Sequence, residues 1–188
     1  MLSSIQLKDE NILLRPFQAD DVESLYQAVR ESLEDVKPWM SWAHDEYSLQ
    51  EAEDFIRITR ARWEEQTLFA FAIIDAITGS VLGGCSLSHK HPTFHFCNIG
   101  YWVRSSRHGQ GIAGRAAKLA ARFGFENAGI IRAEIVMAVG NEKSRHAAEK
   151  TGAHYEGILK NRMVVGTDIY DAHMYSLLPS DFGLVARL

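Results

Sequence analysis

The chain has 188 residues, of which 46% are hydrophobic, and a formal net charge of −4. This length and apolar content suffice for one substantial core, so we expect a single domain spanning residues 1–188. The mildly acidic charge argues against nucleic acid as a direct partner. No apolar run approaches the ~18 residues of a membrane helix, and the first residues lack a secretory signal. A cytoplasmic location is therefore predicted.

The first half of the chain predicts a strand, two amphipathic helices and an antiparallel meander. The strand is expected at Asn11–Phe17. Asp20 then predicts the N-cap of a helix, and Ser48 with Glu51 forms a capping box for a second helix that ends near Gln66. Apolar runs predict three further strands, at Leu68–Ile74, Val81–Ser88 and Thr93–Val103.

The most informative stretch joins a strand to a helix through glycines. Asn98–Val103 is followed by Gly109, Gly111 and Gly114, and then by an alanine-rich helix that ends at Gly129. Glycines at such a turn leave backbone N–H groups free to converge on an anion, and the first turn of the helix adds its positive dipole end. The sequence therefore predicts a phosphate-binding turn.

The spacing of these glycines disfavours the two commonest phosphate motifs. A P-loop needs Lys followed by Ser or Thr after the glycines, and neither pair follows here. Gly109, Gly111 and Gly114 match a dinucleotide fingerprint formally, but a long run of helices and strands precedes them. The acidic residue expected about 20 residues later would be Glu134, which lies inside an apolar run.

The rest of the chain predicts a strand, a short helix and two final strands. The strand is Ala133–Val139, and the helix is capped by Asn141 and ends at Thr151-Gly152. The last strands are Ala153–Met163 and Ile169–Leu178. The resulting order predicts an α/β (α+β) fold with a mixed, mostly antiparallel central sheet of six to seven strands. One parallel β-α-β crossing and helices on both faces complete it.

Six short motifs are spread over nearly the whole chain: Pro38-Trp-Met-Ser-Trp42, Ile99-Gly-Tyr-Trp102, His108-Gly-Gln-Gly-Ile-Ala113, Asn141-Glu-Lys-Ser144, Ala147-Ala-Glu-Lys-Thr-Gly152 and Glu156-Gly157. Together they resemble the GNAT superfamily of N-acetyltransferases, specifically the RimJ/RimL branch of ribosomal-protein acetyltransferases. The resemblance implies a GNAT-like fold and acetyl-CoA as co-substrate, with no metal.

By this resemblance, acetyl-CoA lies in a splay between Asn98–Val103 and Ala133–Val139. Its pyrophosphate rests on the turn from His108 to Ala113, and backbone N–H groups around Trp102 and Val103 polarise the thioester carbonyl. His108 stands where the family usually has Gln or Arg, which leaves the backbone cradle intact. The implied cofactor-binding residues are Trp102, Val103, His108, Gly109, Gln110, Gly111, Ile112, Ala113, Asn141 and Ser144.

The resemblance also implies catalytic roles. Ser144 is predicted to protonate the leaving thiolate and Asn141 to hold the pantetheine arm, although Asn141 is also an ideal N-cap. Where many relatives carry a glutamate, this chain has Asn98, which cannot act as a strong base. Such a site favours an α-amine, with a pKa of ~7.7–8.0, over a lysine amine at ~10.4. Water relayed through Asn98 or a nearby histidine is left open as the base.

The predicted function is acetyl transfer from acetyl-CoA to a primary amine, foremost the N-terminal α-amine of a protein such as a ribosomal protein. Two alternatives stay open: a small-molecule amine such as a polyamine or aminoglycoside, and a catalytically weak CoA-binding sensor module. Trp39 and Trp42 are expected to wall the acceptor pocket, unless one of them fills the gap between the N-terminal helices. A homodimer is also left open.

Three other chemistries find little support. His89, His91 and His95 have a spacing that a metal could use, but no cysteine or carboxylate cluster accompanies them. Cys85 and Cys97 lie in apolar strand-like runs without an adjacent His or Lys, as expected of buried thiols. The Gly-x-Ser-x-Gly turn of serine hydrolases does not occur.

Overall fold

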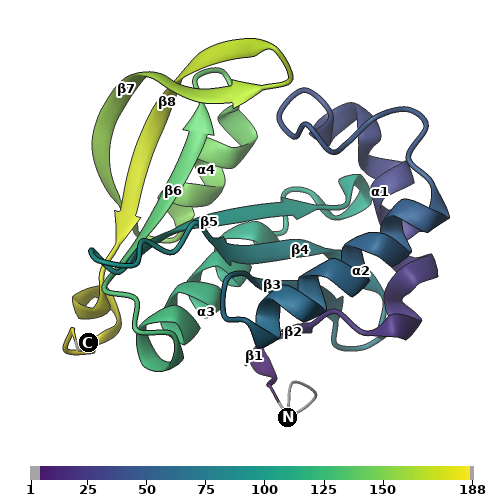
Figure 1. The fold of residues 1–188 in the computed structure, drawn as a ribbon, viewed down its shortest axis with the longest axis horizontal. Coiled ribbons are helices and arrows are strands. Elements are labelled where there is room, and N and C mark those ends of the chain that lie inside the picture. The colour runs from purple at the N-terminus through teal and green to yellow at the C-terminus, as the bar shows by residue number, and fades with distance from the viewer. Residues whose placement is uncertain (1–4, 187–188) are drawn as a thin grey trace.

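The computed structural model describes residues 5–186, drawn as a ribbon in Figure 1. The strands are β1 (Leu7–Asp9), β2 (Ile12–Pro16), β3 (Phe69–Asp75), β4 (Val81–Ser88), β5 (Phe96–Val103), β6 (Arg132–Ala138), β7 (His154–Val165) and β8 (Asp168–Leu177). The helices are α1 (Val22–Val36), α2 (Leu49–Glu64), α3 (Ile112–Asn127) and α4 (Glu142–Lys150). All eight strands belong to one sheet, in the order β1-β2-β3-β4-β5-β6-β8-β7.

The mixed, mostly antiparallel sheet predicted from the sequence is confirmed. β5 and β6 run parallel, with α3 crossing between them, and the other neighbouring pairs in the described residues are antiparallel. The sheet has one strand more than the six to seven expected. The additional strand is β1, which pairs with β2 through three residues at the sheet edge and is too short to leave a periodic pattern.

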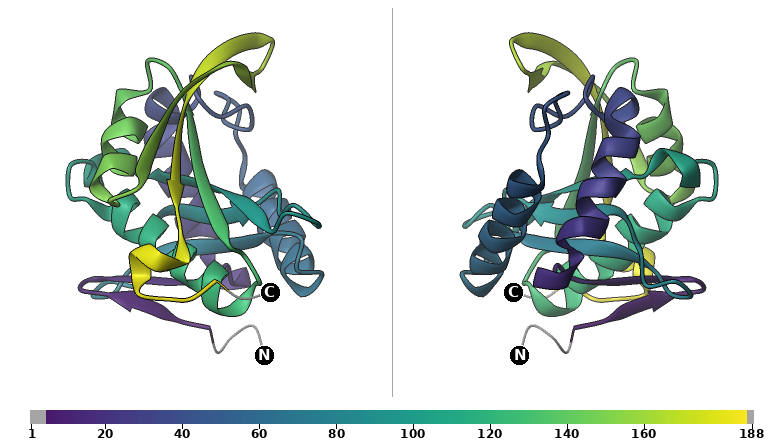
Figure 2. Two further views of the ribbon diagram at one scale, coloured as in Figure 1. Left: turned by 90° about the vertical axis from the view of Figure 1, so that its left-hand side faces the viewer. Right: turned by 90° about the vertical axis from the view of Figure 1, so that its right-hand side faces the viewer.

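Helices cover both faces of the sheet, as the side views in Figure 2 show. On one face, Leu25 of α1 and Ile56 of α2 pack with Ala72 of β3. On the other face, Ala120 of α3 packs with Phe71 of β3. Every residue of β3 is buried because both faces of this strand are covered. Among residues 5–186, no helix is long and apolar enough to cross a membrane.

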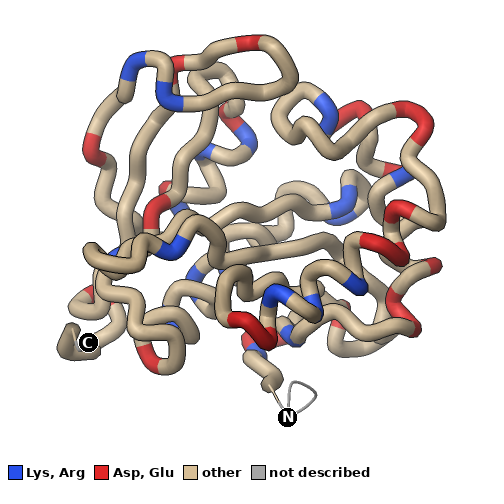
Figure 3. The backbone as a smooth tube through the Cα atoms, in the orientation of Figure 1, with Lys and Arg blue, Asp and Glu red and all other residues tan. Residues whose placement is uncertain are grey.

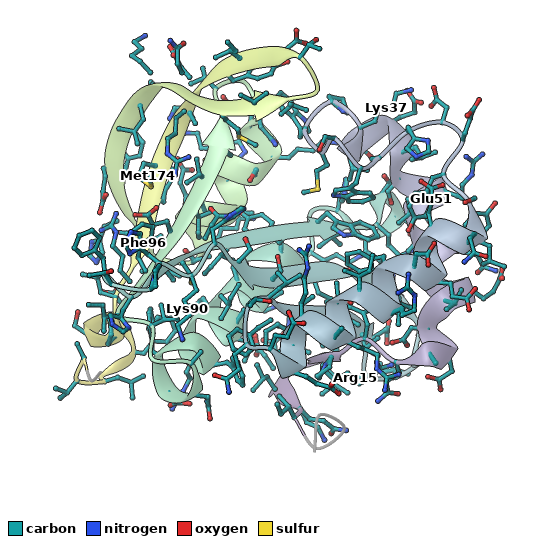
Figure 4. The ribbon with its side chains drawn as sticks, in the orientation of Figure 1. Arg15, Lys37, Glu51, Lys90, Phe96 and Met174 are labelled. Atoms are coloured by element: carbon teal, nitrogen blue, oxygen red, sulfur yellow. The ribbon has the colours of Figure 1, made fainter. Side chains whose placement is uncertain are left out.

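The helix caps agree with the sequence predictions at two of three starts. Ser48 and Glu51 form the predicted capping box of α2, and Asn141 caps α4. The predicted cap at Asp20 is wrong, because α1 begins at Val22 after a 3₁₀ turn at Ala19–Asp21. Asp21 is the buried acid there. Its carboxylate accepts the Gln18 N–H at 2.8 Å and pairs at 2.6 Å with Arg15, labelled in Figure 4.

β5 also begins later than predicted, at Phe96 instead of Thr93. His89 and His95 adopt positive φ angles of 52° and 53°, so the segment between them is a loop and cannot extend the strand. A backbone hydrogen bond from the His91 N–H to the Phe96 carbonyl, at 2.8 Å, closes the loop.

β5 and β6 separate in the middle of the sheet. They are paired only from Phe96↔Arg132 to Asn98↔Glu134. Beyond this point β5 stays paired with β4 as far as Val103, and β6 stays paired with β8 as far as Ala138. The two strands therefore diverge toward their carboxyl ends, as Figure 1 shows. This divergence matches the predicted splay and sets the position of the site.

Candidate active site

A cavity of about 880 Å³ occupies the divergence between β5 and β6. Its walls come from both strands, from the first turns of α3 and α4, and from the end of α1 with the loop that follows. The predicted residues that line it are Trp39, Asn98, Trp102, Val103, His108, Gly109, Gly111, Ile112, Ala113, Asn141 and Ser144. Segments distant in sequence thus form one continuous surface.

The glycine turn has the left-handed backbone that its sequence implied. Gly109 and Gly111 have φ angles of 78° and 71°, and Gly111 is the N-cap of α3. A Cβ atom at either position would meet nothing within 4 Å, so the backbone angle requires glycine and the space in front of the turn is open. Gly114 differs, because a Cβ there would lie 3.1 Å from the Ala147 carbonyl. Gly114 therefore serves the close packing of α3 against α4.

His108 is turned back onto the protein. Its Nε2 lies 2.8 Å from the Val103 carbonyl, and its Nδ1 lies 3.8 Å from the Asp35 carboxylate. The carbonyl can only accept, so Nε2 carries the proton. His108 thus braces the end of β5.

Gln110 lies on the outer side of the turn. It is exposed and borders a second cavity of about 580 Å³ that meets the first at Gly111 and Gly114. Four cationic side chains also line this second cavity: Arg115, Lys118, Arg122 and Lys150. The two cavities share one rim.

The backbone N–H groups of Tyr101 and Val103 in β5 face the divergence, because both residues lie beyond the last pair with β6. The Arg104 N–H donates to the Leu82 carbonyl at 2.7 Å. Backbone direction alternates along an antiparallel strand, so Trp102 also faces β4, and the Val103 N–H faces the side that β6 has left. Of the two residues predicted to polarise a carbonyl, only Val103 therefore has a suitably directed N–H. Trp102 contributes its side chain to the wall.

Ser144 is held at the start of α4 by two neighbours. The Asn141 Oδ1 atom accepts the Ser144 N–H at 3.1 Å, which is the predicted cap. The Ser144 Oγ lies 3.3 Å from the Tyr101 hydroxyl, which in turn donates to the Ser144 carbonyl at 2.9 Å. Burial raises the pKa of Tyr101 to about 12. The Tyr101 hydroxyl therefore stays protonated and serves as a fixed partner of Ser144.

Sequence reasoning did not select Tyr101 as a site residue. A signal was present, because strand alternation places Tyr101 on the same face of β5 as Ile99 and Val103, toward α3 and α4. Only the folded chain brings its hydroxyl to α4, 43 residues further along.

Asp35 is a second residue that the sequence did not single out. Its carboxylate accepts hydrogen bonds from Lys143 of α4 and from Ser105, and it lines the cavity with Lys143. The Lys143 ammonium and the Ser105 hydroxyl hold the pKa of Asp35 below its usual value. Asp35 therefore ties α1 to α4 at the edge of the cavity. No local pattern signals a pair separated by 108 residues.

The two tryptophans of the loop after α1 have different surroundings. Trp39 lines the cavity, and its ring lies 6.5 Å from that of Tyr170 on β8. Trp42 is 40% exposed and packs on Trp102 with ring centroids 5.8 Å apart, outside the cavity lining. Trp39 therefore lies in the cavity wall and Trp42 lies outside it, and the role of either ring toward an acceptor stays a prediction.

Polar side-chain contacts hold this loop to the helices on either side. Lys37 at the end of α1 lies 3.1 Å from Asp45, and His44 lies 2.7 Å from Glu51 of α2. Figure 4 labels Lys37 and Glu51.

The histidines of the loop before β5 and the two cysteines have structural surroundings. The His91 Nδ1 atom accepts the Phe94 N–H at 3.0 Å, and His95 lies 3.2 Å from the Gly129 carbonyl. Residues 5–186 contain no group of three or more side chains placed to hold a metal. Cys85 and Cys97 are buried, and burial raises the pKa of each thiol to about 12, which disfavours the nucleophilic thiolate.

Comparison with known proteins decides the family. A family model of the acetyltransferase (GNAT) domain matches residues 11–154. The chain belongs to the GNAT acetyltransferase family. The Bacillus subtilis (strain 168) protein named "Putative ribosomal N-acetyltransferase YdaF" is 27% identical over 180 residues, which cover 93% of this GNAT chain and 94% of that protein.

Solved GNAT structures share its architecture. A "putative ribosomal-protein-serine acetyltransferase" from Vibrio cholerae superposes with a TM-score of 0.83 at 29% identity, over 95% of this chain and 100% of that one. RimL, named ribosomal L7/L12 α-N-protein acetyltransferase and solved with coenzyme A, has the same fold. Its TM-score is 0.82 at 21% identity, over 93% of this chain and 98% of its own.

Proposed function

We propose that this GNAT enzyme transfers the acetyl group of acetyl-CoA to a primary amine, with the N-terminal α-amine of a protein as its preferred acceptor. One observation carries the proposal: a single cavity of about 880 Å³ is lined by the glycine turn, by Ser144 and by Trp39. An acyl donor with a phosphate-bearing arm requires a site that combines these features.

The glycine turn fits the pyrophosphate of the donor. Left-handed Gly111 opens α3, whose first N–H groups and positive dipole end favour an anion. Of the four cations around the adjoining cavity of about 580 Å³, Arg115 pairs with Glu10 and Arg122 with Glu126, so Lys118 and Lys150 are the cations that fit the additional phosphate at the nucleotide end of CoA. Binding at this turn then leaves the acyl end to lie between β5 and β6.

Three groups supply the chemistry of transfer. The Val103 N–H stabilises the negative charge that develops on the thioester oxygen when the amine attacks. The Ser144 hydroxyl gives its proton to the departing thiolate. The Asn141 side-chain amide uses its oxygen as a helix cap and keeps its N–H₂ group to hold the pantetheine arm.

The acceptor side supports an α-amine. Asn98 offers no strong base, and an α-amine needs less help in losing its proton than a lysine side chain does. Acidic residues concentrate on α1, α2 and the loop between them, as Figure 3 shows, and residues 18–65 carry 13 Asp or Glu and 5 Lys or Arg. This field favours a cationic amine. The names of the B. subtilis and V. cholerae relatives support a ribosomal-protein acceptor, which lies in the cytoplasm.

The test is thiol release from acetyl-CoA with a panel of acceptors: peptides with free N-termini, polyamines and aminoglycosides. We expect release with peptide N-termini. Turnover of a polyamine or aminoglycoside alone would support the small-molecule alternative. Acetyl-CoA binding without turnover of any amine would support the sensor alternative.

A further inference from the structure

Glu134 lies at the point where β5 and β6 separate. It faces Asn98 in the last pair of residues that the two strands share. Directly opposed residues of neighbouring strands project their side chains to the same face of a sheet. Asn98 lines the cavity, and so does Val136, which follows Glu134 by two residues on the same face of β6. A carboxylate therefore stands beside Asn98, at the apex of the divergence, next to the residues that line the cavity but not among them.

The carboxylate of Glu134 is nearly buried and sparsely bonded. Its side chain is 13% exposed, and its Oε1 atom accepts the Nε–H of Arg132 at 2.9 Å. The two terminal nitrogens of Arg132 bind Glu156 of β7 instead, at 2.8 and 2.6 Å. Within the described residues, the Glu134 side chain makes one hydrogen bond, which it accepts from Arg132. Its Oε2 atom accepts no hydrogen bond from the described residues.

The other carboxylates near the apex of the divergence are bound to partners of their own, unlike the Oε2 atom of Glu134. Arg132 on β6 shares its charge between two carboxylates, and Glu156 also accepts the Ser176 hydroxyl of β8 at 2.6 Å. β5 contributes the Cys97 thiol and β7 contributes His154 near Glu156. The carboxylates that line the cavity itself have other partners: Asp35 accepts Lys143 and Ser105, and Glu149 accepts Arg145 and Tyr175.

We propose that Glu134 is the proton acceptor of the transfer and acts through a water molecule held by the Asn98 amide. This inference rests on the proposed function. The acceptor ammonium gives one proton to the water, which passes a proton to the Glu134 carboxylate. The lone pair of the neutral amine then forms the bond to the acyl carbon, and the carbon–sulfur bond breaks. Ser144 protonates the thiolate and regains a proton from the new amide nitrogen, and Glu134 releases its own proton to solvent.

The pH profile of Glu134→Gln tests this role, with acetyl-CoA and a serine-initiated peptide bearing a free α-amine as substrates. At pH 7 we expect kcat/KM for the peptide to fall at least tenfold, with KM for acetyl-CoA unchanged. The deficit closes as the pH rises beyond the α-amine pKa of ~8, because the acceptor then arrives neutral. Glu134→Asp keeps a carboxylate and should recover part of the rate at pH 7.

Glu156→Gln is the matched control, because it removes the other carboxylate bound to the same Arg132. It should keep the pH profile of the wild-type enzyme. Parallel profiles for Glu134→Gln and the wild type overturn the inference. The inference is also overturned if kcat/KM falls by the same factor at every pH in both Glu134→Gln and Glu156→Gln. Such a loss would report only the packing around Arg132. A wild-type enzyme that acetylates no acceptor of the panel overturns the proposed function, and this inference with it.

Discussion

Tyr101 and Ser144 fix each other at the junction of β5 and α4. The tyrosine hydroxyl donates to the Ser144 carbonyl at 2.9 Å and lies 3.3 Å from the Ser144 Oγ. The pair joins the strand wall of the cavity to its helix wall. The serine side chain is therefore positioned before a substrate binds, which lowers the cost of aligning it with a leaving sulfur.

Removal of the serine hydroxyl tests its role in the chemical step. We expect Ser144→Ala to lower kcat by about 10²–10⁴-fold and to leave KM for acetyl-CoA nearly unchanged, because the hydroxyl acts only as charge develops on sulfur. Steady-state kinetics with thermal melts measure this effect. A variant with wild-type kcat would return Ser144 to a structural role.

Asn141→Ala is the comparison for that experiment. Loss of the cap at α4 should cost about 1 kcal/mol of stability and weaken acetyl-CoA binding at the same time. Ser144→Ala, in contrast, should lower kcat without reducing both stability and acetyl-CoA binding.

Tyr101→Phe removes the partner of Ser144 while keeping the ring. We expect a lower kcat in the wild-type background and no further loss in a Ser144→Ala background, because the tyrosine acts through the serine. Its pKa of about 12 keeps the hydroxyl protonated, so the variant should add no new inflection to the rate profile near neutral pH. Equal losses in both backgrounds would contradict this coupling.

The order of elements was largely predictable because each long element carries its own periodic pattern. The capping boxes and glycine ends marked helices such as α2 and α4. The predicted N-cap at Asp20 was wrong because the local pattern cannot distinguish Asp20 from Asp21. Only the folded chain brings Asp21 to its partner, Arg15 of β2. β1 was missed because three residues at an edge take their structure from their partner strand.

Gly111→Val tests the phosphate turn. Valine disfavours the observed φ of 71° and places a branched side chain where the backbone meets the phosphates, so acetyl-CoA affinity should fall at least tenfold, or about 1.4 kcal/mol. Calorimetric titration of the folded variant provides the measurement.

Gly79→Val is the control for backbone strain in that experiment. Gly79 has a φ of 75° and, like Gly111, open space around its Cα, but it lies in the turn between β3 and β4. It should lose stability and keep its affinity. Equal affinities for Gly111→Val and the wild type would make the turn purely structural.

The Arg132–Glu156 pair predicts an acid-sensitive contribution to stability. Hydrogen bonds from Arg132 lower the pKa of Glu156 from its ordinary value of 4.5 to about 2. A lowered pKa stabilises the folded state above pH 4.5, and this contribution is lost as the pH falls toward 2. The Glu156→Gln variant should be less stable than the wild type at pH 7. Its stability, measured by thermal melts, should also vary less with pH across this range. Part of the pH dependence of stability should remain in this variant, because Arg104 also lowers the pKa of Glu31 to about 2.

The site was only partly predictable because its geometry arises between distant segments. The glycine turn, Asn141 and Ser144 lie in local motifs, so the sequence alone suggests them as site residues. The direction of the Val103 N–H depends on the ladder with β4. Asp35 reaches Lys143, and Glu134 meets Asn98, only through the folded chain. Such relationships follow from register and packing, which no single stretch of sequence specifies.

The most direct measurement uses one peptide that carries both a free α-amine and an internal lysine. After incubation with the enzyme and acetyl-CoA, tandem mass spectrometry locates the acetyl group. We expect acetylation of the N-terminal nitrogen, abolished or strongly slowed by Ser144→Ala. Acetylation confined to the lysine, or tight acetyl-CoA binding with no acetylated peptide, would contradict it.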